Sequence, residues 1–505
     1  MLPLLVLLAL PIILFFYFRK HKPKHARNLR PPGPPGLPFI GNFHQFDTQY
    51  PHIYLHSLYK LYGPIMSMKL GSRPVVVISS ANVVKEIMKS HDLAFSGRPV
   101  HVAMHRLSYN GLGIAFISYN DLWKEMRRVL NLHFLSPKQV HLLCPIRKDE
   151  VSRMINQIFR DASLSRATNL SQTIDTTVIN MICRMALGKS SVDEGFTSRF
   201  HELFHDVQRV MAEFCVENYF PWLGWIDKIS GMRKKLEKTF RKLDSFYEEL
   251  IEEHLDKNRP KAMEGDILDI LLGLMRDGLS SIPLTMDHIK AILMNILVAG
   301  TDANVAVVIW TMTVLMKNPI TMKKAQAEIR NLGKKNLIDD NDIASLPYLR
   351  AIIKEVFRLY PPAPILVPRE TSEKCTINGY EIQPKTLVHI NAWAIARDPE
   401  FWKDADEFVP ERFLESEIDV RGRHPELIPF GIGRRGCPGM TMGMAMVDIM
   451  VANLLHAFDW ELPPGLKEDD LDFDMMPGLT MPKKNALCLV AKPVIRILGP
   501  KVLSP

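Results

Sequence analysis

A glycine-rich loop presents a single cysteine, Cys437, in front of an apolar segment. The loop reads FGIGRRGCPG over residues 430–439, and its glycines and proline disfavour helix and strand. Residues 440–458 are apolar at helical spacing, so the cysteine is expected on a turn that enters a helix. Backbone N–H groups, the helix dipole and the nearby Arg435 should lower the pKa of the thiol and favour a metal-binding thiolate. A small buried cysteine without chemistry is the alternative interpretation.

The spacing around the cysteine favours the metal ligand. Phe-x-x-Gly-x-Arg-x-Cys-x-Gly resembles, at every fixed position, the haem-binding signature of the cytochrome P450 family. The resemblance implies that Cys437 is the axial ligand of a haem b iron. Such a thiolate donates electron density to the iron and favours O–O cleavage.

Further haem contacts are expected from cationic side chains. Trp123 and Arg127 are four residues apart and project from one face of a predicted helix, where a simple surface stack is the alternative. In the P450 family this pattern contacts a haem propionate, and Arg98, Arg369 and Arg435 match other propionate contacts. Guanidinium groups supply both the charge and the paired donors that a buried propionate needs.

Residues 284–317 are apolar on nearly all sides and predict one long helix of about 45 Å that crosses the domain. A membrane span is the alternative, but Asp302 and Asn304 at its centre would be costly in lipid. The segment Ala299-Gly300-Thr301-Asp302 resembles the oxygen-binding segment of the family. The resemblance assigns catalytic roles to Asp302 and Thr301.

One position in this helix departs from the family pattern. The acid is usually followed by a threonine that assists proton delivery, and here that position is Ala303. Helical spacing places Asn295, Ala299 and Ala303 on one stripe, which we assign to the side that faces haem and substrate. The missing hydroxyl leaves open a haem-thiolate enzyme that rearranges, dehydrates or couples its substrate without net oxygen insertion. A haem sensor and a haem-free membrane scaffold are the remaining alternatives.

A Glu-x-x-Arg pair, Glu355 and Arg358, lies on one face of a predicted helix and could be an ordinary surface ion pair. The segment FVPERF at 408–413 resembles the family segment whose arginine, here Arg412, completes a buried Glu–Arg–Arg cluster behind the cysteine loop. Two arginines can satisfy a buried glutamate that one would not. Three further residues are candidate substrate contacts by position only: Ala363, Leu366 and Leu479.

The amino-terminal segment, residues 2–18, is uncharged and apolar, about the shortest length that spans a bilayer. A cleaved signal peptide is the alternative, but the run ends in FFYF rather than in small residues. The basic residues that follow place the carboxyl side in the cytosol. We therefore expect a single-pass anchor over 1–20, a basic and proline-rich hinge over 21–38, and a catalytic domain over 39–505.

The composition describes a globular protein with a large core: 505 residues, 47% hydrophobic and 23% charged. Six scattered cysteines without a C-x-x-C pair argue against a disulfide framework and a zinc site, and favour a reducing compartment. The net charge of +8 comes without any nucleic-acid motif, so no nucleic-acid partner is expected.

The matching motifs extend from the proline-rich hinge to Cys437, and the resemblance is to plant microsomal P450s of specialised metabolism. It implies one mainly helical domain with small β-sheets and localisation at the endoplasmic reticulum membrane. It also implies electrons from NADPH through NADPH-cytochrome P450 reductase, reduction of O₂, and oxidation of a small apolar or aromatic molecule. Lys124, Arg128 and Arg434 form a candidate basic patch for the reductase.

Overall fold

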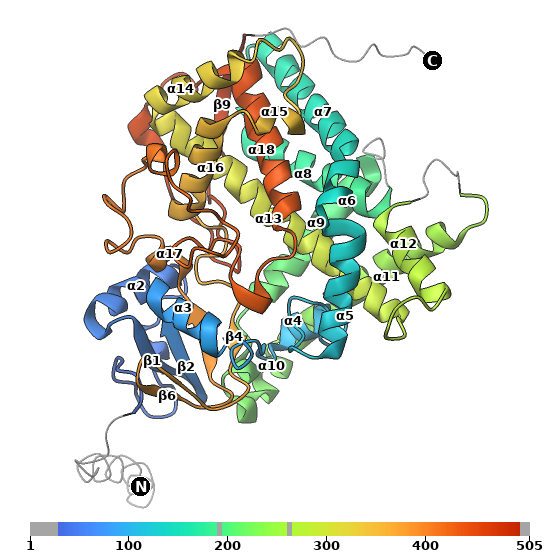
Figure 1. Ribbon diagram of the computed structural model, residues 1–505. Helices are drawn as coiled ribbons and strands as arrows, with labels where there is room; N and C mark the ends of the chain where they lie inside the picture. Colours follow the sequence, from blue (N-terminus) through green and yellow to red (C-terminus); the bar gives the residue numbers. More distant parts are fainter. Residues whose placement is uncertain (1–28, 189–193, 260–264, 495–505) are drawn as a thin grey trace, which may run out of the picture.

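The structure is a computed structural model that describes residues 29–188, 194–259 and 265–494. The predicted membrane anchor over 1–20 and the basic start of the hinge lie outside the described residues. The molecule is mainly helical, as predicted, with small sheets at two opposite ends (Figure 1).

The helices are α2 Pro51–Tyr62, α3 Ala81–Ser90, α4 Val102–Leu107, α5 Asp121–Leu130, α6 Pro137–Leu142, α7 Cys144–Ser163, α8 Leu170–Leu187, α9 Glu194–Ala212, α10 Trp225–Ile229, α11 Met232–Leu255, α12 Ile267–Arg276, α13 Met286–Lys317, α14 Pro319–Arg330, α15 Asp340–Ile343, α16 Pro347–Leu359, α17 Ala392–Ile395 and α18 Met440–Ala457. The strands are β1 Ile65–Leu70, β2 Arg73–Ile78, β3 Thr168–Asn169, β4 Arg369–Glu370, β5 Cys375–Ile377, β6 Tyr380–Ile382, β7 Leu387–Ile390, β8 Phe458–Glu461 and β9 Cys488–Pro493.

Helix α13 is the predicted long apolar helix, and it packs against α8, α16 and α18. It begins at a capping box in which the Thr285 hydroxyl accepts from the His288 N–H and the His288 ring accepts from the Thr285 N–H. Within the described residues, α13 and α18 are long and apolar enough to cross a membrane, but 67% and 72% of their most apolar stretches are buried in the protein. Both are therefore core helices, and the prediction for α13 is confirmed.

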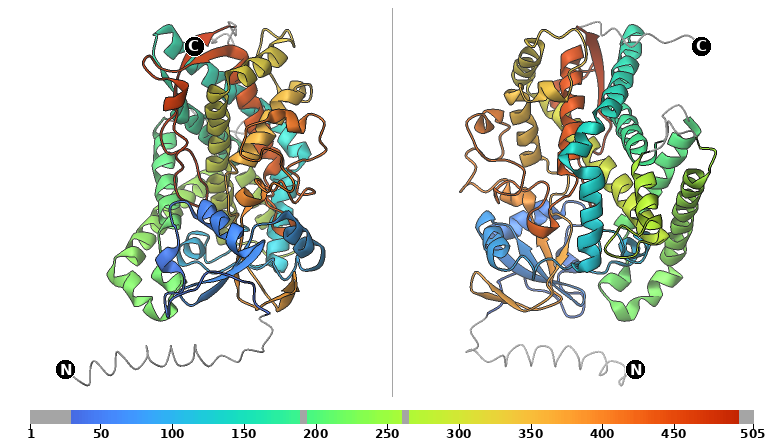
Figure 2. Two further views of the ribbon diagram at one scale, coloured as in Figure 1. Left: turned by 90° about the vertical axis from the view of Figure 1, so that its left-hand side faces the viewer. Right: turned by 45° about the vertical axis from the view of Figure 1, so that its right-hand side comes forward.

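The largest sheet has the order β1-β2-β7-β4. Strand β2 pairs antiparallel with β1 and parallel with β7, so that Ile78 lies opposite Ile390. The runs VVVI and LVHI are buried throughout, as expected for strands covered on both faces. This sheet lies at the bottom of the molecule and β9 at the top in both views of Figure 2.

The proline-rich segment packs along β1 in an extended conformation. Ser67 donates from its N–H to the carbonyl of Pro32 at 2.7 Å and from its hydroxyl to the carbonyl of Pro31 at 2.6 Å. A Cβ on Gly33 would lie 1.7 Å from the carbonyl oxygen of Ser67, so this close approach requires glycine. The described part of the hinge is therefore fixed to the body of the protein.

Candidate functional site

The cysteine loop is a tight turn that leads directly into α18. The N–H of Cys437 donates to the carbonyl of Phe430 at 2.8 Å, and α18 begins at Met440. Gly433 has a φ of +70°, and a Cβ there would lie 2.5 Å from the sulfur of Met88. The predicted position of the cysteine at a helix entrance is confirmed.

The environment of the sulfur differs from the expectation in one respect. Burial raises the pKa of the Cys437 thiol, whereas the Gly439 N–H and Arg127 act in the opposite direction. The predicted fall in pKa is wrong for the protein chain alone, because the sequence argument counted nearby charge but not the loss of solvent. The charge that acts on the sulfur is Arg127 rather than Arg435. Cys437 is nonetheless exposed, although protein atoms surround its sulfur.

Three buried guanidinium groups gather beside this loop. Arg98, Arg369 and Arg435 are 7%, 3% and 8% exposed, and carbonyl oxygens are the acceptors of their hydrogen bonds. None of the three forms an ion pair with a described residue. Burial and mutual repulsion hold the pKa of Arg98 well below its usual value, while burial first and repulsion by Arg369 second lower the pKa of Arg435 to about 9. Burial lowers the pKa of Arg369 to about 10.

Helix α5 adds Trp123 and Arg127 to the same region. The Trp123 indole N–H donates to the carbonyl of Ile114 at 3.1 Å, and Arg127 donates to the carbonyl of Gly436, next to the cysteine, at 2.8 Å. The guanidinium groups of Arg435 and Arg127 lie 4.8 and 5.2 Å from the Trp123 ring. The five predicted propionate contacts therefore lie in one region around the cysteine loop.

The middle of α13 is more open than the rest of the helix. Ala299 is exposed and Ala303 half-buried, whereas Asn295 is buried and its amide oxygen accepts from the N–H of Ala115 at 3.0 Å. Asn295 is thus held by the loop before α5. The hydroxyl of Thr301 donates to the carbonyl of Leu297 at 2.7 Å, and Asn304 donates to the carbonyl of Gly300 at 2.6 Å. The polar side chains on either side of Ala303 are thus turned back onto their own helix.

Asp302 has partners that sequence reasoning did not identify. Burial and, to a smaller extent, Asp175 raise the pKa of its carboxyl, while hydrogen bonds from Gln208 and Thr480 and the electrostatic interaction with His205 lower it. The Thr480 hydroxyl lies 3.4 Å from the carboxylate oxygen. Gln208 is on α9 and Thr480 on a late loop, and no motif near either residue pointed to this contact.

The positional substrate candidates lie on two irregular segments. Ala363 and Leu479 are half-buried, while Leu366 is buried, adopts a φ of +50° and donates from its N–H to the carbonyl of Ala363 at 3.0 Å. Leu479 precedes Thr480, so the late loop does reach α13 at Asp302.

The Glu–Arg–Arg cluster forms as predicted. Arg358 donates to both carboxylate oxygens of Glu355 at 2.7 and 2.8 Å, and both side chains are fully buried. Arg412 donates to the same carboxylate at 3.1 Å, and the N–H of Val409 donates to it at 2.9 Å. Phe357 on the same helix packs against Phe430 of the cysteine loop, with ring centroids 5.0 Å apart. The cluster therefore supports the loop from behind.

Comparison with known proteins agrees with this geometry. The family model described as Cytochrome P450 matches residues 31–490. The chain belongs to the cytochrome P450 family. This P450 is 44% identical over 499 residues to 6,7,8-trihydroxycoumarin synthase of Pastinaca sativa, covering 97% of this chain and 98% of that protein. It is 43% identical over 486 residues to strychnine-11-hydroxylase of Strychnos nux-vomica, covering 95% and 95% of the two chains.

The fold of this P450 is also found among solved structures. A zebrafish cytochrome P450 solved with abiraterone superposes with a TM-score of 0.74 at 25% identity, and the match covers 88% of this chain and 99% of that one. The predicted fold class and enzyme class are confirmed: the protein is an oxidoreductase of the haem-thiolate monooxygenase family.

The residues of this P450 fit the haem that its family carries. Arg98 Nε and Arg369 Nη1 are buried donors without a hydrogen-bond partner. Burial lowers the pKa of both guanidinium groups, and repulsion by Arg435 and Arg369 lowers that of Arg98 further. Two propionates would supply the missing acceptors and the missing negative charge. Cys437 is the exposed sulfur in the same region and would be the iron ligand.

Proposed function

We propose that this P450 hydroxylates a small apolar or aromatic specialised metabolite of plants, using O₂ and electrons from NADPH delivered by NADPH-cytochrome P450 reductase. The thiolate-ligated haem supplies the chemistry when bound: it reduces O₂ with two electrons and inserts one oxygen atom into the substrate. The names of the relatives support this, since one is a trihydroxycoumarin synthase and the other a strychnine hydroxylase.

The observation that carries the proposal is the half-buried carboxyl of Asp302 in the middle of α13. Because burial raises its pKa, the group holds a proton at a higher pH than an exposed aspartate does. Oxygen insertion consumes protons, whereas a rearrangement of the substrate does not. A carboxyl in this state suits a proton-consuming reaction, and no relative named here favours rearrangement or coupling.

The chain's own residues have separate roles in this proposal. Asp302 holds a proton at its carboxylate oxygen, and Thr480 and Gln208 orient it through hydrogen bonds. The methyl groups of Ala299 and Ala303 leave room for substrate beside it. Thr301 keeps its hydroxyl on the carbonyl of Leu297, so we assign it to the shape of the helix and not to proton transfer in this conformation.

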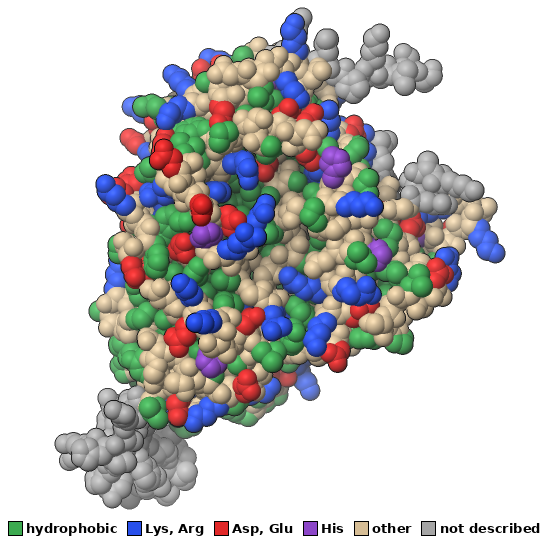
Figure 3. Space-filling view, in the orientation of Figure 1, with side chains coloured by type: hydrophobic (Ala, Val, Ile, Leu, Met, Phe, Trp, Pro, Cys, Tyr) green, Lys and Arg blue, Asp and Glu red, His purple; other side chains and the backbone are tan. Residues whose placement is uncertain are grey.

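The membrane and partner assignments are part of the same proposal. We infer a single-pass membrane anchor over 1–20, with the catalytic domain on the cytosolic side of the endoplasmic reticulum. The inference rests on the length of the apolar segment and on the basic residues that follow it. The reductase would meet the face that carries Lys124, Arg128 and Arg434. Lys124 pairs with Asp121 and Arg434 with Asp92, so this docking surface is of mixed charge. Figure 3 shows Lys and Arg side chains interspersed with Asp and Glu on the face in view.

The test is turnover in microsomes with reductase, NADPH and ¹⁸O₂ against a panel of coumarins and indole alkaloids. We expect a product that carries one labelled oxygen atom, and a rate about 10²-fold or more lower in Asp302→Asn. Asp287→Asn, an exposed acid in the first turn of the same helix, is the control and should leave the rate unchanged. Product formation without labelled oxygen, or without NADPH, would overturn the proposal.

Cys437→Ser provides an independent check on the haem ligand. The reduced, carbon-monoxide-bound protein should lose the red-shifted Soret band of thiolate ligation. Cys144→Ser and Cys375→Ser should keep it, and a normal thiolate band in Cys437→Ser would refute the assignment.

A further inference from the structure

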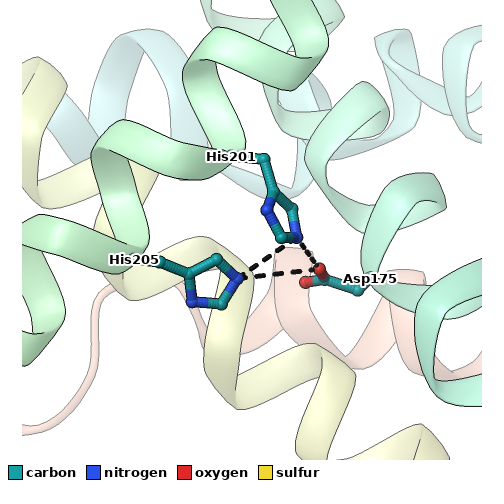
Figure 4. Close-up of side chains that lie close together, drawn as sticks. All are labelled: Asp175, His201 and His205. Carbon is teal, nitrogen blue, oxygen red and sulfur yellow. Dashed lines mark hydrogen bonds and ion pairs between the residues drawn. The ribbon is translucent and has the colours of Figure 1, made fainter.

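Away from the cysteine loop, helices α8 and α9 bring two histidines and an aspartate together (Figure 4). His201 Nε2 lies 2.5 Å from Asp175 Oδ2 and 3.2 Å from His205 Nε2. His205 Nε2 lies 4.0 Å from Asp175 Oδ2. The three potential ligand atoms therefore point toward one place.

The helices explain why these atoms converge. His201 and His205 are four residues apart on α9 and lie on the same face, while Leu203 and Val207 on other faces of α9 are buried in the core. Asp175 projects from α8, which lies beside α9 in Figure 4. Anchoring of α9 through its apolar side chains thus holds both imidazoles toward the carboxylate.

Hydrogen bonds among these three side chains do not satisfy all three atoms. If His201 donates its Nε2–H to Asp175, its Nε2 has no lone pair left to accept a bond from His205. Two imidazole nitrogens and a carboxylate oxygen then compete for a single proton at short range. One cation at the centre would accept a lone pair from all three atoms at once.

The distances fit a small divalent metal. Ligand atoms around a tetrahedral Zn²⁺ with bonds of 2.0–2.2 Å lie about 3.3 Å apart. The three atoms here are 2.5, 3.2 and 4.0 Å apart, so small rotations of the side chains would bring them to these separations. We propose that Asp175, His201 and His205 form a binding site for a divalent transition metal of the Zn²⁺ type. Two imidazoles and one carboxylate are a usual ligand set for such ions. The side chains of His201 and His205 are 42% and 56% exposed, so metal and a fourth, water ligand can enter.

A second histidine and aspartate cluster shows the contrast. His254, Asp266 and Asp269 also lie close together, but the guanidinium of Arg259 donates to Asp266 at 2.8 Å and to Asp269 at 2.5 Å. That cluster already contains its cation. Among the described residues, no lysine or arginine bonds to Asp175, so the negative charge at the α8–α9 cluster is open to a metal.

A metal at this site would join α8 to α9 next to the catalytic acid. Gln208, which hydrogen-bonds Asp302, follows His205 by one turn of α9, and His205 itself acts electrostatically on Asp302. The site would therefore fix the position of Gln208 relative to α13. The proposal rests on the α8–α9 geometry alone and stands whether or not the proposed substrate class is correct.

The test is zinc binding to the full-length holoenzyme without a histidine tag, measured by competition with a chromophoric chelator. The wild type should bind one equivalent of Zn²⁺ that His201→Ala and His205→Ala bind at least about 100-fold more weakly. His141→Ala, which removes an exposed histidine of α6, should behave as wild type. Saturating Zn²⁺ should raise the melting temperature of the wild type and of His141→Ala but not of the two site variants.

The thiolate Soret band reports whether each variant is folded. If an alanine variant fails to fold, the nearly isosteric Asp175→Asn decides the question by the same affinity and melting measurements. Wild type that binds no zinc at micromolar concentrations, or folded site variants that retain the wild-type affinity, would overturn the proposal.

Discussion

Replacing Asp448 by asparagine should stabilise the folded protein, and by more at pH 8 than at pH 5.5. Asp448 lies on α18, is 8% exposed, and its Oδ1 is buried without a hydrogen-bond partner. Burial raises the pKa of its carboxyl from the usual 3.8 to about 7, with Arg350 opposing and Asp340 adding to the rise. A raised pKa in the folded state means that the proton is held more tightly there than in the unfolded chain.

The magnitude follows from the two pKa values. The tighter proton binding of Asp448 in the folded state adds to the free energy of unfolding. This contribution is fully present below about pH 4, falls as the pH rises, and is lost above about pH 7. The difference between 3.8 and about 7 corresponds to about 4 kcal/mol, of which about 2 kcal/mol is already lost at pH 5.5. Asparagine carries no charge at either pH, so the advantage of Asp448→Asn over wild type should grow from about 2 to about 4 kcal/mol.

The assay is thermal unfolding of the wild type and Asp448→Asn at pH 5.5 and pH 8.0 at constant ionic strength. Comparing the two proteins at each pH cancels the titration of all other groups. Asp459→Asn, an exposed acid on the following strand, should shift the melting temperature equally at both pH values. A gap between Asp448→Asn and wild type that stays constant or narrows with pH would refute the reasoning.

Three further predictions concern the site and its supports. Glu355→Gln should destabilise the fold by about 3–5 kcal/mol, because it leaves the buried guanidinium of Arg358 and the half-buried guanidinium of Arg412 without their anion. Loss of the thiolate Soret band on mild heating measures this, and the exposed Glu415→Gln is the control. Ala303→Thr should place a hydroxyl within reach of the carbonyl four residues earlier, as in Thr301. With the native substrate, the variant should couple less of its NADPH use to product formation, and higher coupling would contradict this. Lys124→Glu should slow reduction by the reductase in a salt-dependent manner without changing substrate affinity, whereas Lys257→Glu should not, and equal reduction rates in both variants would remove the patch from the interface.

The choice of Lys124 follows from a feature that sequence alone did not reveal. Arg128 donates two hydrogen bonds, at 2.9 and 2.7 Å, to Glu125, whose side chain is 6% exposed. Charge reversal at Arg128 would leave the negative charge of that glutamate without a partner. An effect on reductase docking could then not be separated from a loss of stability. Lys124 pairs with Asp121, which is 88% exposed, so its reversal is a cleaner test of the basic patch.

Features set by local chemistry could be predicted from the sequence. The glycine-rich loop, the apolar α13 and the Glu355–Arg358 pair each depend on residues within a few positions of one another, and all three form as expected. The identity of the family also followed from such short motifs.

Features set by burial and by distant contacts could not be predicted. The direction in which the pKa of Cys437 shifts depends on how far the folded chain removes its sulfur from solvent, and no local sequence pattern shows that burial. The contact between Thr480 and Asp302 joins residues 178 positions apart, and neither lies in a motif that names the other. The Asp175, His201 and His205 cluster was missed for the same reason, since its carboxylate comes from another helix.

The parallel pairing of β2 with β7 has a consequence for synthesis of the chain on the ribosome. Ile78 pairs with Ile390, so the apolar edge of β2 has no native partner until most of the polypeptide has been translated. At about 5–20 residues per second this interval lasts on the order of 15–60 s. During that time an unpaired, β-branched edge is open to neighbouring nascent chains. Slower elongation before codon 387 should therefore increase aggregation and dependence on chaperones, whereas slower elongation after codon 390 should not.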